Sequence, residues 1–174
     1  MPLPDLSLVL GGAASGKSAF AEDLVLRGSD NPIYVATAQV FDDEMAQKVA
    51  HHRKTRGTKW ITVEEPIDLP GALARAKAGQ PVLIDCATLW LTNLILGEYD
   101  IADHCEALMD AIAACNGPVI IVTNEVGQGI VPENALARRF RNAQGQMNQA
   151  LAAKADLVVA VMAGLPMTLK GKLP

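Results

Sequence analysis

Aromatic residues are scarce in this chain. Trp, Tyr and Phe make up 4% of its 174 residues, although hydrophobic residues as a group make up 50%. The apolar content therefore comes mainly from Ala, Val, Leu and Ile, which are the side chains that fill a parallel sheet buried on both faces. The sequence has no internal repeat, low-complexity segment or linker. We expect one domain over residues 1–174, with a sizeable core.

An excess of positive charge is also missing. The chain has 15 Lys and Arg against 19 Asp and Glu, which gives a net charge of −4 at pH 7. A protein that binds nucleic acid over a broad surface needs a basic face. The charge balance therefore argues against a nucleic-acid partner.

Cysteine pairs and long apolar runs are lacking too. Cys86, Cys105 and Cys115 show no C-x-x-C spacing, so we expect small buried thiols in a reducing compartment. No apolar run is long enough to span a bilayer, and we see no secretory signal peptide. These features predict a cytoplasmic protein without a transmembrane segment.

Short apolar runs alternate with helical patterns along the chain. Runs typical of strands occupy residues 6–10, 32–36, 60–63, 82–85, 119–123, 157–162 and a short 167–169. Apolar residues at helical spacing occupy residues 17–27, 43–55, 69–78, 101–115 and 133–155. This alternation predicts βαβ units, and hence an α/β fold with a mostly parallel sheet and helices on both faces.

The strongest motif lies between the first strand and the first helix. It fits the P-loop pattern G-x-x-x-x-G-K-[ST] with Gly11, Gly12, Ala13, Ala14, Ser15, Gly16, Lys17 and Ser18. In such a loop the backbone N–H groups and the helix N-terminus surround phosphate groups. Lys17 would reach the β- and γ-phosphates, and the Ser18 hydroxyl would ligate Mg²⁺. The alternative is a glycine-rich turn with a chance Lys-Ser pair, but the flanking strand and helix favour a nucleoside triphosphate site.

A second nucleotide signal is Asp85, at the end of the apolar run 82–85. An acidic residue at that place can hold Mg²⁺, directly or through water, beside Ser18. Many strands end in Asp, so the alternative is that Asp85 caps the following turn.

Two adjacent histidines lie within the helical pattern 43–55. At about 100° per residue, His52 shares an apolar stripe with Met45 and Val49, and it reads as a packing residue. His51 falls outside this stripe and would face solvent or a ligand. Spacing alone favours a solvated helix residue at His51.

A polar loop with two glycines follows the strand 119–123. A strand's carboxyl end is where α/β sheets place ligands. The loop could therefore bind substrate, with Arg138, Arg139 and Arg141 meeting phosphate or carboxylate groups. The alternative is an ordinary loop in which Glu133 or Asn134 starts a helix and the arginines are solvated.

Taken together, five blocks carry a resemblance to a known family: residues 11–18, 34–39, 42–53, 85–93 and 123–141. In this order they closely resemble the bifunctional adenosylcobinamide kinase / adenosylcobinamide-phosphate guanylyltransferase family of cobalamin synthesis, nearly end to end. The resemblance implies a RecA-like P-loop domain. The resemblance further implies that the protein phosphorylates adenosylcobinamide, a corrinoid, with ATP or GTP. It then transfers GMP from GTP to that phosphate, with Mg²⁺ as cofactor.

The resemblance also implies site residues and an assembly. It places a covalent guanylyl-histidine at His51 and implies a homo-oligomer, a trimer. It implies GTP contacts for residues 11–18 and for Thr37, Ala38, Gln39, His52, Arg53, Lys54, Thr55, Glu64 and Asp85. One departure is Ala14, where many members carry Arg, so this P-loop has one positive charge fewer.

Two other functions are compatible with parts of this sequence. A small-molecule kinase without the guanylyl step would also need the P-loop and Asp85. A GTP-dependent regulatory switch fits less well, because the chain has no N-K-x-D motif and residues 85–88 do not form a D-x-x-G element.

Overall fold

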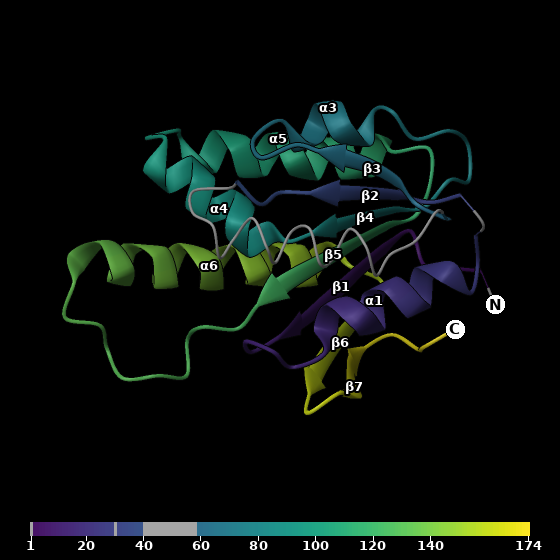
Figure 1. Ribbon diagram of the computed structural model, residues 1–174. Coiled ribbons are helices and arrows are strands. Elements are labelled where there is room, and N and C mark those ends of the chain that lie inside the picture. The colour runs from purple at the N-terminus through teal and green to yellow at the C-terminus, as the bar shows by residue number, and fades with distance from the viewer. Residues whose placement is uncertain (1, 30, 40–58) are drawn as a thin grey trace.

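A seven-stranded sheet forms the centre of the protein (Figure 1). The computed structural model describes residues 2–29, 31–39 and 59–174. Its strands are β1 (Leu6–Gly11), β2 (Ile33–Ala36), β3 (Ile61–Glu64), β4 (Val82–Asp85), β5 (Val119–Asn124), β6 (Leu157–Met162) and β7 (Leu165–Lys170). Its helices are α1 (Lys17–Leu26), α3 (Leu69–Leu73), α4 (Ala87–Leu96), α5 (Ile101–Ala114) and α6 (Ala135–Lys154).

The strand order is β3-β2-β4-β5-β1-β6-β7. All neighbouring strands are parallel except β6 and β7, which form an antiparallel hairpin at one edge. The carboxyl ends of β1 to β5 therefore lie side by side at the same end of the sheet, where ligands bind in such folds.

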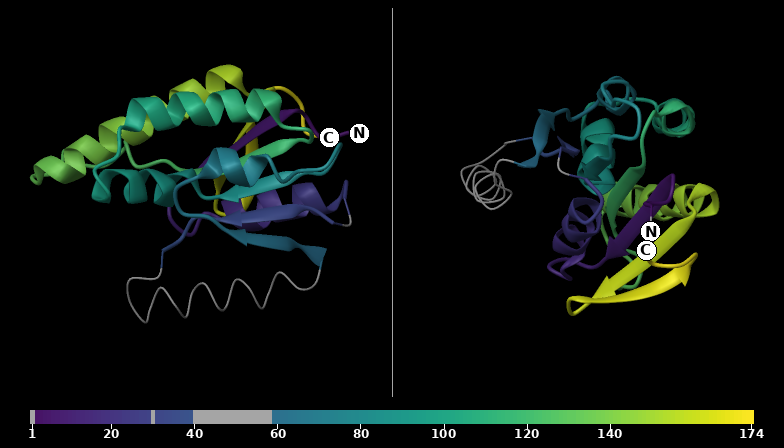
Figure 2. Two further views of the ribbon diagram at one scale, coloured as in Figure 1. Left: turned by 90° about the horizontal axis from the view of Figure 1, so that it is seen from above. Right: turned by 90° about the vertical axis from the view of Figure 1, so that its right-hand side faces the viewer.

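Helices cover both faces of this sheet, as the two further views show (Figure 2). Helix α1 packs on one face, in a core that includes Val9, Leu83 and Ile120. Helices α3 to α6 pack on the other face, where Trp90 is fully buried among aliphatic side chains. The predicted α/β fold with a mostly parallel sheet is confirmed.

Side-chain caps set the starts of three helices. Asp68 accepts a hydrogen bond from the backbone N–H of Gly71, and Asp100 accepts one from Asp103. Asn134 accepts from the N–H groups of Leu136 and Ala137 at 2.8 and 3.1 Å. Such caps satisfy N–H groups that have no partner within the helix. Of the two candidates for the start of α6, the structure selects Asn134.

The secondary structure departs from the sequence prediction in two places. The helix predicted over 69–78 ends at Leu73. The residues after it form turn hydrogen bonds that span three residues instead of the four of an α-helix, such as the bond from the Ala76 N–H to the Leu73 carbonyl. Helix α4 was not predicted, since seven of its ten residues are buried and they leave no clear apolar stripe. The predicted helix 43–55 lies outside the described residues.

Candidate nucleotide site

The P-loop connects β1 directly to α1. Its backbone turns through two left-handed residues, Ala14 with φ 53° and Gly16 with φ 93°. Only Gly adopts such a conformation without strain from a Cβ atom. Gly16 is also crowded, because a Cβ placed on it would lie 3.1 Å from the Cα of Gly164. The glycine in the predicted motif is therefore required by both the backbone angle and the available space.

Lys17 is the first residue of α1, and only 9% of it is exposed. Its Nζ donates to the carbonyl oxygen of Gly12 at 2.9 Å, so the ammonium group lies across the loop. This position places a positive charge beside the N-terminus of α1, which already favours anions. The two features together create a site for a polyanion such as a triphosphate.

A second feature of the loop points to a ligand. The Ser15 Oγ is buried and has no hydrogen-bond partner among the described residues. Buried hydroxyl groups in proteins nearly always have a partner. A bound phosphate oxygen would supply one for this hydroxyl.

Asp85 is the last residue of β4 and lies at the same end of the sheet as the P-loop. Strand β5 lies between β4 and β1, so these two strands are about 10 Å apart. Mg²⁺ with its water and phosphate ligands can bridge such a gap. The Asp85 Oδ2 accepts a hydrogen bond from the Tyr34 hydroxyl at 2.8 Å, and Oδ1 accepts none from the described residues.

The electrostatics at Cys86 reflect these charges. Burial raises the pKa of the Cys86 thiol to about 11, and the negative charge of Asp85 adds to the increase. The positive charge of Lys17 acts in the opposite direction.

The donor atoms suit Mg²⁺ in chemical type. Ser18 offers a hydroxyl oxygen and Asp85 a carboxylate oxygen, which are the hard ligands that this ion prefers. Among the described residues, no three His, Cys, Asp or Glu side chains gather into a metal cluster. Magnesium needs no such cluster, because it is usually held by one or two carboxylates together with water and substrate phosphates.

Thr37 follows β2 at the same end of the sheet and is fully buried. Its Oγ1 donates to the carbonyl of Cys86 and accepts from the Cys86 N–H, both at 2.8 Å. The Thr37 carbonyl in turn accepts from the Asn93 side-chain amide at 2.8 Å. Thr37 thus joins the carboxyl ends of β2 and β4. Ala38 and Gln39 follow it in the chain and are partly buried.

The remaining predicted site residues are spread over the chain. Glu64 ends β3, at the far edge of the sheet from the β6–β7 hairpin, with three strands between β3 and β1. The other predicted residues lie outside the described part of the chain: His51, His52, Arg53, Lys54 and Thr55.

The loop between β5 and α6 is held by two of the three arginines. Arg138 donates to the Pro132 and Glu133 carbonyls, and Arg141 donates to the Gly129 carbonyl at 3.3 Å. In this structure these guanidinium groups bind loop backbone rather than the phosphate or carboxylate groups that the sequence suggested. Ile130 at the loop is 96% exposed.

Sequence reasoning missed two contacts at the site. One is Tyr34, whose position inside an apolar strand resembles that of an ordinary core residue. The other is Thr88 at the start of α4, whose Oγ1 accepts from the Asn124 N–H at 2.7 Å. A polar group within an otherwise aliphatic strand was the available signal for Tyr34.

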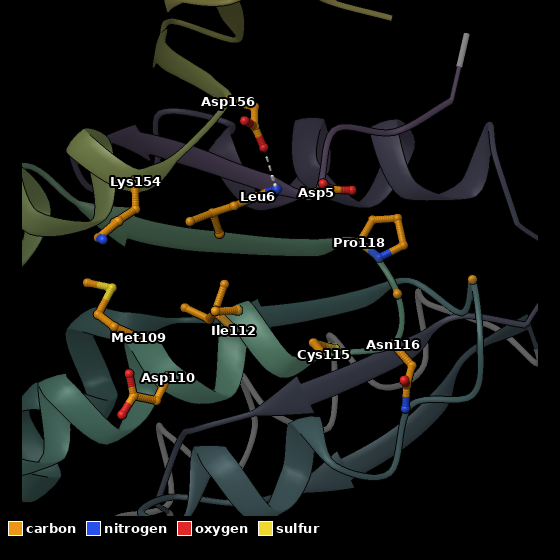
Figure 3. Close-up of a pocket in the computed structure, with 13 residues that line it drawn as sticks. Asp5, Leu6, Met109, Asp110, Ile112, Cys115, Asn116, Pro118, Lys154 and Asp156 are labelled. Atoms are coloured by element: carbon orange, nitrogen blue, oxygen red, sulfur yellow. Dashed lines mark hydrogen bonds between the residues drawn. The ribbon is translucent and has the colours of Figure 1, made fainter.

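A cavity of about 580 Å³ lies elsewhere in the molecule (Figure 3). It is lined by Leu6, Met109, Ile112, Pro118 and Lys154, among others. Leu6 and Pro118 lie at the amino ends of β1 and β5, so this cavity is at the opposite end of the sheet from the P-loop. It is separate from the candidate nucleotide site. No helix in the described part of the chain has the length and hydrophobicity to cross a membrane.

The fold is similar to that of a protein of known structure. A protein from Pyrococcus horikoshii OT3 superposes with a TM-score of 0.56 at 8% identity, covering 98% of this chain and 88% of its own. The RadB recombinase superposes with a TM-score of 0.48 at 19% identity, covering 91% of this chain and 74% of its own.

Closer relatives are found by sequence. The Pseudomonas aeruginosa bifunctional adenosylcobalamin biosynthesis protein CobP is 44% identical over 168 residues, covering 95% of this chain and 97% of its own. The Escherichia coli K12 protein CobU, with the same description, is 41% identical, covering 94% of this chain and 98% of its own. The model of the family "cobinamide kinase / cobinamide phosphate guanyltransferase" matches residues 7–169. This chain therefore belongs to the cobinamide kinase / cobinamide phosphate guanyltransferase family.

Proposed function

We propose that this protein is a bifunctional enzyme with two successive reactions. It phosphorylates the aminopropanol hydroxyl of adenosylcobinamide with ATP or GTP. It then transfers GMP from GTP to that phosphate, which gives adenosylcobinamide-GDP and pyrophosphate. The observation that carries the proposal is the P-loop, with Lys17 across it and the unpartnered Ser15 hydroxyl, in a chain of this family.

The kinase step uses the P-loop directly. The corrinoid hydroxyl oxygen attacks the γ-phosphorus, the bond from that phosphorus to the β,γ-bridging oxygen breaks, ADP or GDP leaves, and the hydroxyl proton passes to solvent. Lys17 and the N-terminus of α1 stabilise the negative charge that develops on the phosphate oxygens. Ser18 and Asp85 would hold Mg²⁺, which when bound would offset charge on the departing nucleoside diphosphate.

The guanylyl transfer proceeds through His51. A neutral imidazole nitrogen is a good nucleophile near pH 7, because His titrates near about 6.5. It attacks the α-phosphorus of GTP and releases pyrophosphate, forming a P–N bond. A phosphate oxygen of adenosylcobinamide phosphate then attacks the same phosphorus, and the P–N bond breaks. The covalent intermediate divides one difficult transfer into two easier steps.

The test is mass spectrometry of the protein after incubation with GTP and Mg²⁺. We expect one GMP per chain on His51, labile in acid and stable in base, as a P–N bond should be. His51→Ala should lose the adduct and the guanylyl transfer, yet keep the kinase step. His52→Ala should behave differently: it should lose stability from packing and bind nucleotide more weakly, yet keep the adduct at saturating GTP. An adduct on another residue would refute the assignment, and kinase activity without any adduct would favour a simple kinase.

Two further properties belong to the same proposal. We expect the enzyme to act in the cytoplasm, where its nucleotide substrates are found. We also expect a homo-oligomer, a trimer, which sedimentation of the purified protein would test.

A further inference from the structure

The hydroxyl of Tyr34 donates a hydrogen bond to the Oδ2 of Asp85 over 2.8 Å. The two residues are 51 positions apart and come from neighbouring strands, β2 and β4. Tyr34 pairs with Leu83 in this part of the sheet, so its side chain shares a face with Asp85, two residues further along β4. That face also carries α1.

The tyrosine is held firmly. Only 3% of Tyr34 is exposed, and its ring meets Trp60 edge-on, with the ring centroids 5.5 Å apart and the planes at 90°. The hydroxyl therefore has a fixed place at the carboxyl end of β4. Asp85 itself is only partly buried, so without this bond its carboxylate could rotate toward solvent.

We propose that Tyr34 is a positioning residue that orients the Asp85 carboxylate for Mg²⁺. The inference rests on the proposed function, in which Asp85 helps to hold the ion. The hydrogen bond occupies Oδ2 and leaves Oδ1 free of hydrogen bonds from the described residues, available to the metal or to one of its waters. Partners of this kind fix the orientation of ligating carboxylates, and removing them typically weakens metal binding about 10- to 100-fold.

A purely structural role would give a different result. A buried tyrosine needs a hydrogen-bond acceptor, and Asp85 could serve only for that purpose. In that case, loss of the hydroxyl would lower stability without changing the affinity for metal. The two roles are therefore separable by measuring both quantities on the same variants.

The experiment measures binding of Mn²⁺, as a paramagnetic substitute for Mg²⁺. Mn²⁺ is titrated into the protein with α,β-methylene GTP, from which GMP cannot be transferred, and the free ion is followed by its electron paramagnetic resonance signal. Tyr34→Phe keeps the ring and removes the hydroxyl. We expect its Mn²⁺ dissociation constant to rise about tenfold. The Mg²⁺ concentration for half-maximal kinase activity should rise similarly, with kcat at saturating Mg²⁺ close to wild type.

Trp60→Phe is the matched control. It keeps an aromatic ring beside Tyr34 and leaves the Tyr34–Asp85 hydrogen bond in place, so it should lower the melting temperature and leave the Mn²⁺ affinity unchanged. Asp85→Asn should weaken Mn²⁺ binding, and adding Tyr34→Phe to it should cause no further loss.

Three results would overturn the proposal in distinguishable ways. If Asp85→Asn weakens Mn²⁺ binding and Tyr34→Phe does not, the positioning role is wrong, while Asp85 remains a metal residue. If Asp85→Asn itself leaves binding unchanged, the assignment of Asp85 in the proposed function fails, and this inference fails with it. If Tyr34→Phe weakens Mn²⁺ binding equally in the wild-type protein and in the Asp85→Asn variant, Tyr34 does not act through the Asp85 carboxylate.

Discussion

The backbone N–H of Gly164 donates to the carbonyl oxygen of Ser15 over 2.8 Å, which joins the β6–β7 hairpin to the P-loop. The two hairpin residues, Ala163 and Gly164, have φ values of 52° and 77°, as a tight two-residue turn requires. The antiparallel edge of the sheet thus supports the phosphate-binding loop from the side. The loop conformation depends on a contact about 150 residues away in the chain.

Replacing Gly16 with Ala should disrupt this arrangement. The alanine would have to keep the left-handed backbone conformation of Gly16, and its Cβ would lie 3.1 Å from the Gly164 Cα. We expect a loss of about 1–3 kcal/mol in the free energy of unfolding. Urea unfolding without nucleotide or metal measures it. Gly12→Ala is the control, because its Cβ would meet nothing within 4 Å. Similar losses for both variants would show that the close approach to Gly164 is unimportant.

Replacing Gly145 with Ala should have the opposite effect. Gly145 lies inside α6, and a Cβ there would meet nothing within 4 Å. Alanine loses less backbone freedom on folding, so we expect stability to increase by about 0.5–1 kcal/mol. Urea unfolding of the two proteins gives the difference. A lower stability would mean that the position is constrained by something besides helix propensity.

Replacing Lys17 with Ala should reduce both reactions. The ammonium group lies across the P-loop, where it would neutralise phosphate charge in both transition states. Removal of one such group typically costs about 100- to 1,000-fold in rate. Kinase and guanylyl-transfer assays measure the loss, and circular dichroism checks the fold. Lys77→Ala, on an exposed turn, serves as the control. Normal turnover by a well-folded Lys17→Ala protein would contradict the P-loop assignment.

The Cys86 thiol should contribute a pH dependence to stability. Burial, followed by the charge of Asp85, raises its pKa from 9.0 to about 11 in the folded protein. Between these values the unfolded chain ionises while the folded protein does not, so stability falls as pH rises. The loss by pH 11 is on the order of 2 kcal/mol.

Comparison with Cys86→Ala isolates this contribution. The variant should be less stable than wild type at pH 8, because a buried side chain has been shortened. The difference should shrink toward pH 11, since only wild type loses the thiol contribution. Urea unfolding in EDTA at several pH values measures it, and a constant difference would rule out the raised pKa.

Local patterns determined much of this protein from the sequence alone. The P-loop is a continuous run whose glycines, lysine and serine act through backbone angles and a helix start, so its spacing predicts its structure. The seven strand positions and the ends of α1 and α5 also follow from nearby residues. A helix such as α4 escapes this reasoning, because burial on nearly every side removes the periodic pattern.

Tertiary structure decided what residues do across distance. The strand order places β5 between the P-loop strand and β4, and it places the antiparallel hairpin beside the phosphate loop. The bonds from Tyr34 to Asp85 and from Gly164 to Ser15 each join distant segments of the chain. Periodicity records only whether a side chain faces a core, whereas these contacts depend on which strands pair and in what register. For that reason a tyrosine that looks like core in the sequence lies against a carboxylate of the nucleotide site.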